Sequence, residues 1–431
     1  MKKPVLTFLA AILLMPAVTM AELTIEITSG DDNPTKIAIA PTSVRGLSLS
    51  DSISSIVAAD LTRSGLFRTI PQRDMLSFPS AARQVRYRDW NLLGAEYLVV
   101  SQVAPREGGQ MAVTFSLMNI TAQKAVFTTT LNGNPSSVRK MAHIISDKVY
   151  EEITGIRGAF TTQLLYVTSE RGVNRKNVFR LMRADADGAR EVELLRSSEP
   201  IMSPSWSPDG KEVLYVSFES GRSAIYRQNI ATGQSEQLTN FRGINSAPAW
   251  SPDGNKLAMT LSKDGNPELY LFDLRTRRFT RLTRQPAIDT EPTWMPDSKH
   301  LLFTSDRGGT PQIYKMNVVS GKVQRLTFRG RYNARGRLAP DGRTLVMVHQ
   351  DDSGRFHIAA YDLVSKLFQV LTSTSLDESP TVSPNGAMVM YATKRGGKGV
   401  LAAVSLDRGG KFYLPARRGD VREPAWSPFL R

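Results

Sequence analysis

The side chains best suited to chemistry are carboxylates in the C-terminal half of the sequence. Each stands just ahead of a short predicted strand, and they are Asp289, Glu291, Asp377, Glu378 and Glu423. If the loops that carry them converge, they form an acidic rim that attracts a cation or basic side chains. Two carboxylates facing one another are also what glycoside hydrolysis requires. Ordinary variation among surface loops is the alternative explanation.

Other catalytic signatures are absent from the sequence. The four histidines stand in no metal-ligand spacing, and we interpret each as structural or surface: His143, His300, His349 and His357. There is no cysteine, which excludes thiol nucleophiles and thiolate metal sites. The sequence contains no GxSxG, P-loop or GxGxxG motif. We therefore predict no catalytic residue, no metal site and no cofactor.

The elements that must position the carboxylates belong to an internal repeat. Six prolines stand 44 residues apart: Pro208, Pro252, Pro296, Pro340, Pro384 and Pro428. The clearest copies read PSWSPDG at residues 204–210 and PAWSPDG at residues 248–254. Four of the five tryptophans lie in this motif, and we expect them to pack between neighbouring sheets. A period of about 40 to 50 residues is typical of β-propellers and solenoids.

Strand patterns favour the propeller over an open solenoid. After each Pro-Asp-Gly turn come an apolar run, a glycine-rich turn and two more short strands, which together make a four-stranded antiparallel blade. Six motif copies predict six blades. We expect the strand around Trp426 to complete the last blade beside residues 164–167, 178–181 and 192–195. Such closure removes exposed sheet edges.

Residues just before the first strand of each blade are expected to ring the mouth of the propeller channel. Unlike the framework, they differ from blade to blade, which favours a role in binding. They are Asn245, Ser246 and Ala247; Asp289, Thr290 and Glu291; Asn333, Ala334 and Arg335; Asp377 and Glu378; Arg422 and Glu423.

The residues before the repeat form a separate predicted domain. Residues 22–29 and 36–40 alternate like strands, residues 97–103 form an apolar strand and residues 111–131 a hairpin. Helices are predicted at residues 51–63 and from Pro135 to Gly155, and residues 155–162 are the predicted linker. The sequence thus predicts an α/β N-terminal domain (22–160) and an all-β six-bladed propeller (161–431) closed by the C-terminal strand.

Residues 1–21 have the pattern of a cleaved secretory signal. Two lysines precede an apolar run of about fourteen residues, which is shorter than the roughly 20 needed to span a bilayer. A retained anchor is the alternative. No later segment reaches membrane-spanning length, so we expect the mature chain to begin at Glu22 in the periplasm. Removing Lys2 and Lys3 lowers the net charge from +15 to +13; in an exported protein we do not expect nucleic acid as the partner.

Several segments together resemble the TolB family. They are the start at residues 22–25, FESGRS at residues 218–223 and TEPTW at residues 290–294. The resemblance covers the whole chain and implies a non-enzymatic periplasmic component of the Tol–Pal system, which supports outer-membrane integrity and constriction at cell division.

The resemblance also implies partners and their sites. The lipoprotein Pal would bind at the propeller mouth, through Ile244, Asn245, Ser246, Ala247, Asp289, Thr290, Glu291, Arg335, Asp377 and Glu378. TolA would bind the mature N-terminus, through Glu22, Leu23, Thr24, Ile25, Glu26 and Ile27. Other outer-membrane or peptidoglycan-associated proteins and bacteriocins are further partners that the family suggests.

Two other interpretations stay open. The first is an enzyme related to propeller glycosidases. Its carboxylate pair would come from Asp289, Glu291, Asp377, Glu378 or Glu423. The second is a protein that binds peptidoglycan or the envelope surface directly through its positive charge. Turnover of peptidoglycan fragments would favour the first, and salt-dependent binding to purified peptidoglycan without Pal would favour the second.

Overall fold

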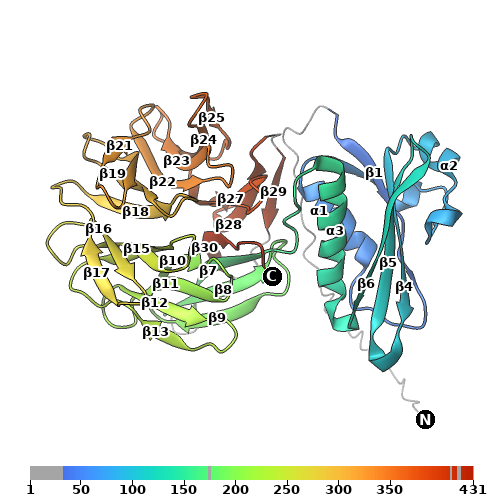
Figure 1. Ribbon diagram of the computed structural model, residues 1–431, viewed down its shortest axis with the longest axis horizontal. Helices are drawn as coiled ribbons and strands as arrows, with labels where there is room; N and C mark the ends of the chain where they lie inside the picture. Colours follow the sequence, from blue (N-terminus) through green and yellow to red (C-terminus); the bar gives the residue numbers. More distant parts are fainter. Residues whose placement is uncertain (1–32, 173–175, 408–409, 415–418, 431) are drawn as a thin grey trace, which may run out of the picture.

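The protein consists of an α/β domain and a β-propeller that pack side by side (Figure 1). The computed structural model describes residues 33–172, 176–407, 410–414 and 419–430. The predicted signal at residues 1–21 and the predicted TolA-binding residues 22–27 lie outside the described residues.

The first domain is built on a mixed sheet with strand order β3-β1-β4-β5-β6, and β2 pairs with β4. Strand β1 runs parallel to β3 and β4, whereas β4, β5 and β6 form an antiparallel meander. The strands are β1 (Thr35–Ile39), β2 (Ser43–Val44), β3 (Phe67–Ile70), β4 (Tyr97–Pro105), β5 (Met111–Asn119) and β6 (Lys124–Gly133).

Helices α1 (Ile53–Arg63) and α3 (Val138–Thr154) cover the face of this sheet that is turned toward the propeller (Figure 1). Capping residues in the sequence mark the start of α1 and the end of α3. The Ser52 hydroxyl accepts a hydrogen bond from the backbone N–H of Ser55, and Gly155 ends α3 in the left-handed conformation at φ 74°. None of the helices among the described residues is long and apolar enough to cross a membrane.

The opposite face of the sheet is covered by short elements that the sequence pattern did not predict. They are two 3₁₀ turns (Gln72–Asp74 and Ala82–Gln84) and helix α2 (Tyr87–Leu92). Trp90 on α2 is fully buried among apolar residues of β1, β4 and β5. The six residues of α2 are too few to show helical periodicity, and tertiary packing supplies their stability.

Six four-stranded antiparallel sheets form the propeller, as predicted. The first five are β10 (Ile201–Trp206) to β13 (Ser235–Gln237), β14 (Asn245–Trp250) to β17 (Arg278–Arg281), β18 (Asp289–Trp294) to β21 (Val323–Arg325), β22 (Tyr332–Leu338) to β25 (Phe368–Val370), and β26 (Glu378–Val382) to β29 (Lys411–Leu414). The two middle strands of these sheets are β11 (Glu212–Ser217), β12 (Ala224–Asn229), β15 (Lys256–Leu261), β16 (Glu268–Asp273), β19 (His300–Ser305), β20 (Gln312–Asn317), β23 (Thr344–Gln350), β24 (Phe356–Asp362), β27 (Met388–Arg395) and β28 (Lys398–Ser405).

The sixth sheet closes the ring with both ends of the propeller sequence. Its order is β30-β7-β8-β9, so β30 (Asp420–Trp426) pairs with β7 (Gln163–Arg171), followed by β8 (Asn177–Asp185) and β9 (Val192–Ser197). The predicted closure by the C-terminal strand is confirmed.

The repeated motif explains why each blade folds in the same way. In the first copy the Ser207 hydroxyl donates to Asp209 at 2.7 Å and accepts from the backbone N–H of Glu212 at 2.9 Å, which ties the turn to β11. Gly210 completes the turn at φ 71°. Trp206 packs between the first and last sheets, and its indole N–H donates to the Ala425 carbonyl of β30 at 3.0 Å. The prediction that these tryptophans lie between sheets is confirmed.

Candidate partner-binding site

A β-bulge in the first strand of every blade shapes the channel wall. Pairing with the second strand shifts register in all six blades, at the residues around the motif's first proline or its equivalent. One residue in each bulge takes a positive φ although it is not glycine: Ser203, Ala247, Glu291, Arg335, Ser379 and Glu423. Bulges re-aim side chains, and these six equivalent positions all line the central channel.

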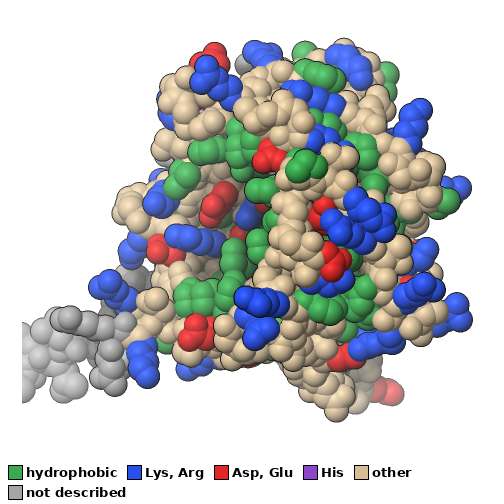
Figure 2. Space-filling view, turned by 90° about the vertical axis from the view of Figure 1, so that its left-hand side faces the viewer, with side chains coloured by type: hydrophobic (Ala, Val, Ile, Leu, Met, Phe, Trp, Pro, Cys, Tyr) green, Lys and Arg blue, Asp and Glu red, His purple; other side chains and the backbone are tan. Residues whose placement is uncertain are grey.

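The channel encloses a cavity of about 440 Å³. Its wall combines this ring with the neighbouring prolines and four tryptophans, among them Trp250 and Trp426. Figure 2 views the protein from the propeller side and shows a hollow near the middle of this face, with acidic and basic side chains inside it.

The charged side chains of the channel neutralise one another. The Arg335 guanidinium donates from Nε to Glu291 at 2.9 Å and from Nη1 to Glu423 at 3.1 Å and to the Ser379 hydroxyl, and so bridges four blades. Arg337 lies deeper and donates to the Thr293 hydroxyl at 2.6 Å. Glu291 also accepts from the Thr304 hydroxyl at 2.9 Å. The two lining glutamates and two lining arginines therefore balance in formal charge.

Burial and charge act in opposite directions on these arginines. Burial alone would lower the pKa of Arg335, but the adjacent Glu423 and Glu291 outweigh it and raise that pKa above its usual value. Burial lowers the pKa of Arg337, whose hydrogen-bond partners among the described residues are the Thr293 hydroxyl and the Gly336 carbonyl. Burial also raises the pKa of Tyr332, with Glu291 adding to the effect.

The predicted acidic rim does not form as one surface. Asp289 is fully buried, and its carboxylate accepts from Arg307 at 2.7 Å. Asp377 is also fully buried and accepts from the hydroxyls of Thr374 and Thr393. These side chains hold loops in place instead of facing a ligand, so the rim prediction was wrong for both.

Asn245 has the same structural role in its own blade. Its side chain is fully buried, donates to the Phe241 and Gly243 carbonyls and accepts from the backbone N–H of Phe241. Asn333 occupies the equivalent position and donates to the Arg329 carbonyl at 2.7 Å. The shared 44-residue spacing of these buried residues was a usable sign that they belong to the framework.

Most of the remaining predicted residues lie at or in the channel; Ala334 is buried, and neither it nor Arg422 lines the cavity. Ser246, Ala247, Thr290, Glu291 and Arg335 line the cavity. Glu378 is partly exposed at the start of β26, and its charge contributes to the raised pKa of Arg335. Ile244, beside Asn245, is 44% exposed.

Sequence reasoning missed three further side chains at the mouth. Ile288 and Leu376 occupy the repeat position of Ile244 and are 47% and 41% exposed. Tyr332 occupies the same position and is half-buried. The mouth therefore has apolar side chains around a hollow that contains ion pairs, and the repeat spacing from Ile244 was the signal that would have found them.

Both glutamates of the channel are engaged. Glu291 and Glu423 accept from the same guanidinium, and Glu291 also accepts from Thr304 and from the backbone N–H of Arg335. General acid catalysis needs a carboxyl group within hydrogen-bond reach of the substrate. In this geometry a substrate would have to displace Arg335 first.

An α/β domain followed by a six-bladed propeller with a charged channel defines a class of two-domain propeller proteins. Two family models match the chain: the TolB amino-terminal domain over residues 23–126 and the TolB beta propeller domain over residues 150–430. The chain belongs to the TolB family.

Individual relatives agree with this assignment. The chain is 57% identical to the Tol-Pal system protein TolB of Pseudomonas fluorescens strain Pf-5, over 95% of each chain. It is 54% identical to that of Pseudomonas aeruginosa, over 98% of each. The crystal structure of TolB from Acinetobacter baumannii matches with a TM-score of 0.87 at 40% identity, over 94% of this chain and all of that one.

Proposed function

We propose that the protein is a non-enzymatic periplasmic adaptor of the Tol–Pal system, which binds Pal at the propeller mouth and TolA through residues 22–33. In this role it supports outer-membrane integrity and constriction during cell division. The relatives in Pseudomonas are Tol-Pal system proteins, which supports the assignment to this system. Pal and TolA are the partners that the family resemblance implies.

The observation that carries the Pal proposal is the composition of the mouth. Ile244, Ile288 and Leu376 expose apolar area around an entrance whose interior is polar and charged. Protein interfaces combine an apolar anchor region with hydrogen-bonding groups that fix orientation. The Arg335 ion pairs would supply those groups to a polar segment that enters the channel.

Calorimetric titration with the soluble domain of Pal tests this proposal. We expect one-to-one binding by the wild type and a loss of affinity of about five- to thirtyfold in Ile244→Ser/Ile288→Ser, since two half-exposed anchors contribute about 1–2 kcal/mol together. Val319→Ser is the matched control, because Val319 is 89% exposed in the β20–β21 turn at the opposite end of its blade. Equal affinity for all three proteins would refute docking at the mouth.

The TolA proposal concerns a segment whose alternating pattern fits strand addition to a partner's sheet. Deleting residues 22–33 is expected to abolish TolA binding and to preserve Pal binding. Loss of both would show that the deletion damages the fold, and retention of TolA binding would refute the assignment. Absence of turnover of peptidoglycan fragments by the purified protein is the further expectation for an adaptor.

A further inference from the structure

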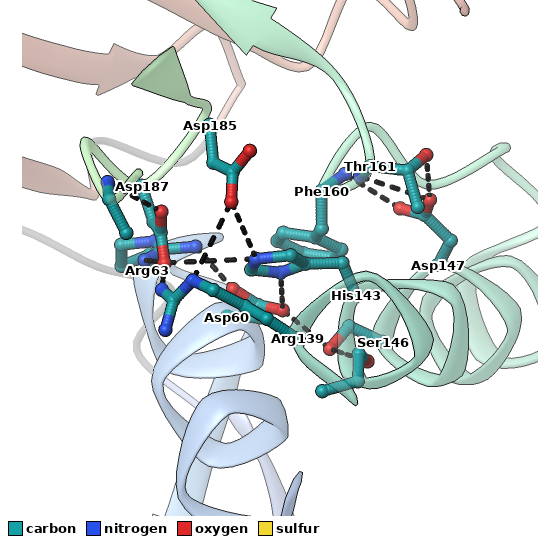
Figure 3. A network of polar contacts seen from close by, with 12 residues as sticks. Asp60, Arg63, Arg139, His143, Ser146, Asp147, Phe160, Thr161, Asp185 and Asp187 are labelled. Atoms are coloured by element: carbon teal, nitrogen blue, oxygen red, sulfur yellow. Dashed lines mark hydrogen bonds and ion pairs between the residues drawn. The ribbon is translucent and has the colours of Figure 1, made fainter. Parts of the chain in front are cut away.

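A buried polar cluster joins the two domains at the end away from the channel mouth (Figure 3). His143 on α3 is 2% exposed, and its Nδ1 lies 2.7 Å from Oδ2 of Asp60 on α1. The same carboxylate oxygen accepts from the Ser146 hydroxyl at 2.6 Å, and the other oxygen pairs with Arg63. One nitrogen of the imidazole is therefore anchored within the N-terminal domain.

The other imidazole nitrogen faces the propeller. Nε2 of His143 lies 3.9 Å from Oδ2 of Asp185, the last residue of β8, and 3.8 Å from Oδ2 of Asp187 in the following turn. This nitrogen is buried and has no hydrogen-bond partner among the residues that the structure describes. A buried polar atom without a partner costs about 1–3 kcal/mol. A positive charge between Nε2 and the two carboxylates would remove this cost.

Among the described residues, the charged groups of the cluster around His143 come from three segments. Asp60 and Arg63 lie on α1 with Asp51 just ahead of it, Arg139 lies on α3, and Asp185, Asp187 and Arg190 lie at the end of β8 and in the turn that follows. Asp147 on α3 accepts from the backbone N–H groups of Phe160 and Thr161 instead. Arg139 pairs with Asp51, Asp185 and Asp187, and Arg190 pairs with Asp185 at 2.7 Å. The four carboxylates outnumber the three guanidinium groups by one, so one further positive charge is favoured.

A proton is a better candidate than a metal ion for that charge. Asp60, His143 and Asp187 offer ligand atoms within 4.8 Å of one another. However, Arg63 and Arg139 already bind these carboxylates, and a divalent cation would have to displace both guanidinium groups. A proton on Nε2 adds a donor toward Asp185 and Asp187 and displaces nothing.

We propose that His143 is a proton-operated latch between the domains: its protonated imidazole holds the β8–β9 turn of the propeller against α3, and its deprotonation loosens the domains. This regulation goes beyond the proposed function and does not depend on the identity of the partners. The bridge runs from Asp60 through the imidazole to the propeller carboxylates, so charge on one ring acts on both domains.

The direction of the pH dependence follows from the surroundings. Burial by itself lowers the pKa of His143, but Asp60 and Asp187 outweigh burial and raise that pKa above the usual 6.5. The latch is therefore fully closed below a pH of about 6.5 and opens as the pH rises through the raised pKa. Burial raises the pKa of Asp187, but Arg63, His143 and Arg139 outweigh it and keep that pKa low.

Two measurements on the full chain test the latch. Because the chain has no cysteine, spin labels at Glu152→Cys and Ser220→Cys, both exposed sites, report the distance between the domains. We expect one narrow distance distribution at about pH 6, and a broader or longer one at about pH 9, where histidine is neutral. NMR titration of the imidazole is expected to give a pKa above 6.5 for His143.

Variants separate the latch from general effects of pH. His143→Gln, which cannot be protonated in this range, is expected to show the loosened distribution at every pH. His300→Gln is the matched control, because His300 also pairs with an aspartate but lies in the propeller, and it should behave like the wild type. Asp147 is a second buried group, and burial raises its pKa. The variant Asp147→Asn removes its titration, so any pH response that this variant keeps does not come from Asp147.

Three results would overturn the proposal. They are a His143 pKa at or below 6.5, an unchanged distance distribution while His143 loses its proton, and a full pH response in His143→Gln. If His143→Gln does not fold, the wild-type and Asp147→Asn titrations still decide, since they compare the His143 pKa with the pH at which the distance changes. Pal binding is not a readout here, so failure of the latch and failure of the proposed function are distinguishable.

Discussion

Replacing Arg335 by methionine would remove the group that bridges four blades across the channel. Its guanidinium contacts Glu291 at 2.9 Å and Glu423 at 3.1 Å, so the substitution leaves two carboxylates without their cation. Methionine is similar in length and unbranched at Cβ. It therefore accepts the left-handed backbone of position 335, at φ 52°, at about the same cost as arginine.

The size of the effect follows from the partial burial of the three side chains. Removing one partner of a fully buried pair costs about 3–5 kcal/mol, whereas exposed pairs contribute less than about 1 kcal/mol. The side chains of Arg335, Glu291 and Glu423 are 27%, 21% and 15% exposed. We therefore expect a loss of about 2–3 kcal/mol, which corresponds to a fall of about 4–10 °C in the propeller's Tm.

Differential scanning calorimetry of the full chain measures this change. The triple variant Arg335→Met/Glu291→Gln/Glu423→Gln removes the uncompensated charges, and we expect it to recover most of the loss. A fall in Tm of less than about 1 °C, or a triple variant as unstable as the single one, would refute the electrostatic explanation.

Three further predictions follow from the fold. Deleting residues 420–431 removes β30 and is expected to unfold the propeller, with loss of its near-UV circular dichroism; a native spectrum would contradict the closure argument. In denaturant unfolding, Trp206→Phe should lower the free energy of unfolding by about 1–2 kcal/mol more than Trp250→Phe. Of these two indole N–H groups, that of Trp206 donates a hydrogen bond and that of Trp250 has no partner among the described residues; equal losses would be inconsistent with this bond. Gly158→Ala would place a methyl group 2.8 Å from Cβ of Asp147 and should lower the free energy of unfolding by about 1–3 kcal/mol in the same assay. An unchanged denaturation midpoint would show that the backbone around Gly158 shifts to accommodate the methyl group.

Repetition made the propeller readable from the sequence. The 44-residue spacing of proline and the turn chemistry after it predict the number of blades, their four strands and the closure near Trp426. The predicted helices at residues 51–63 and from Pro135 correspond to α1 and α3, since long amphipathic segments carry a strong periodic signal. Helix α2 was missed, because tertiary packing of Trp90 stabilises a segment too short to show that signal.

Which side chains face the channel was decided by the tertiary structure. Glu291 and Asp289 stand two residues apart, yet one lines the cavity and the other is fully buried with Arg307. The bulge at the positive-φ residue turns one side chain inward, and neither composition nor spacing reveals a bulge. The 44-residue recurrence of Asn245, Asp289, Asn333 and Asp377 was a sign of the framework, but the sequence could not tell which of their neighbours line the channel.

At the domain interface, too, the tertiary structure decides what the sequence pattern cannot predict. His143 stands in no ligand spacing, and the sequence by itself supports only a structural or surface role. Folding brings it to Asp60 on another helix and to Asp185 and Asp187 on the propeller. Local pattern determines which elements form, because turn and helix signals act over a few residues. Long-range packing determines which ionisable groups meet out of water, and that meeting gives His143 its raised pKa.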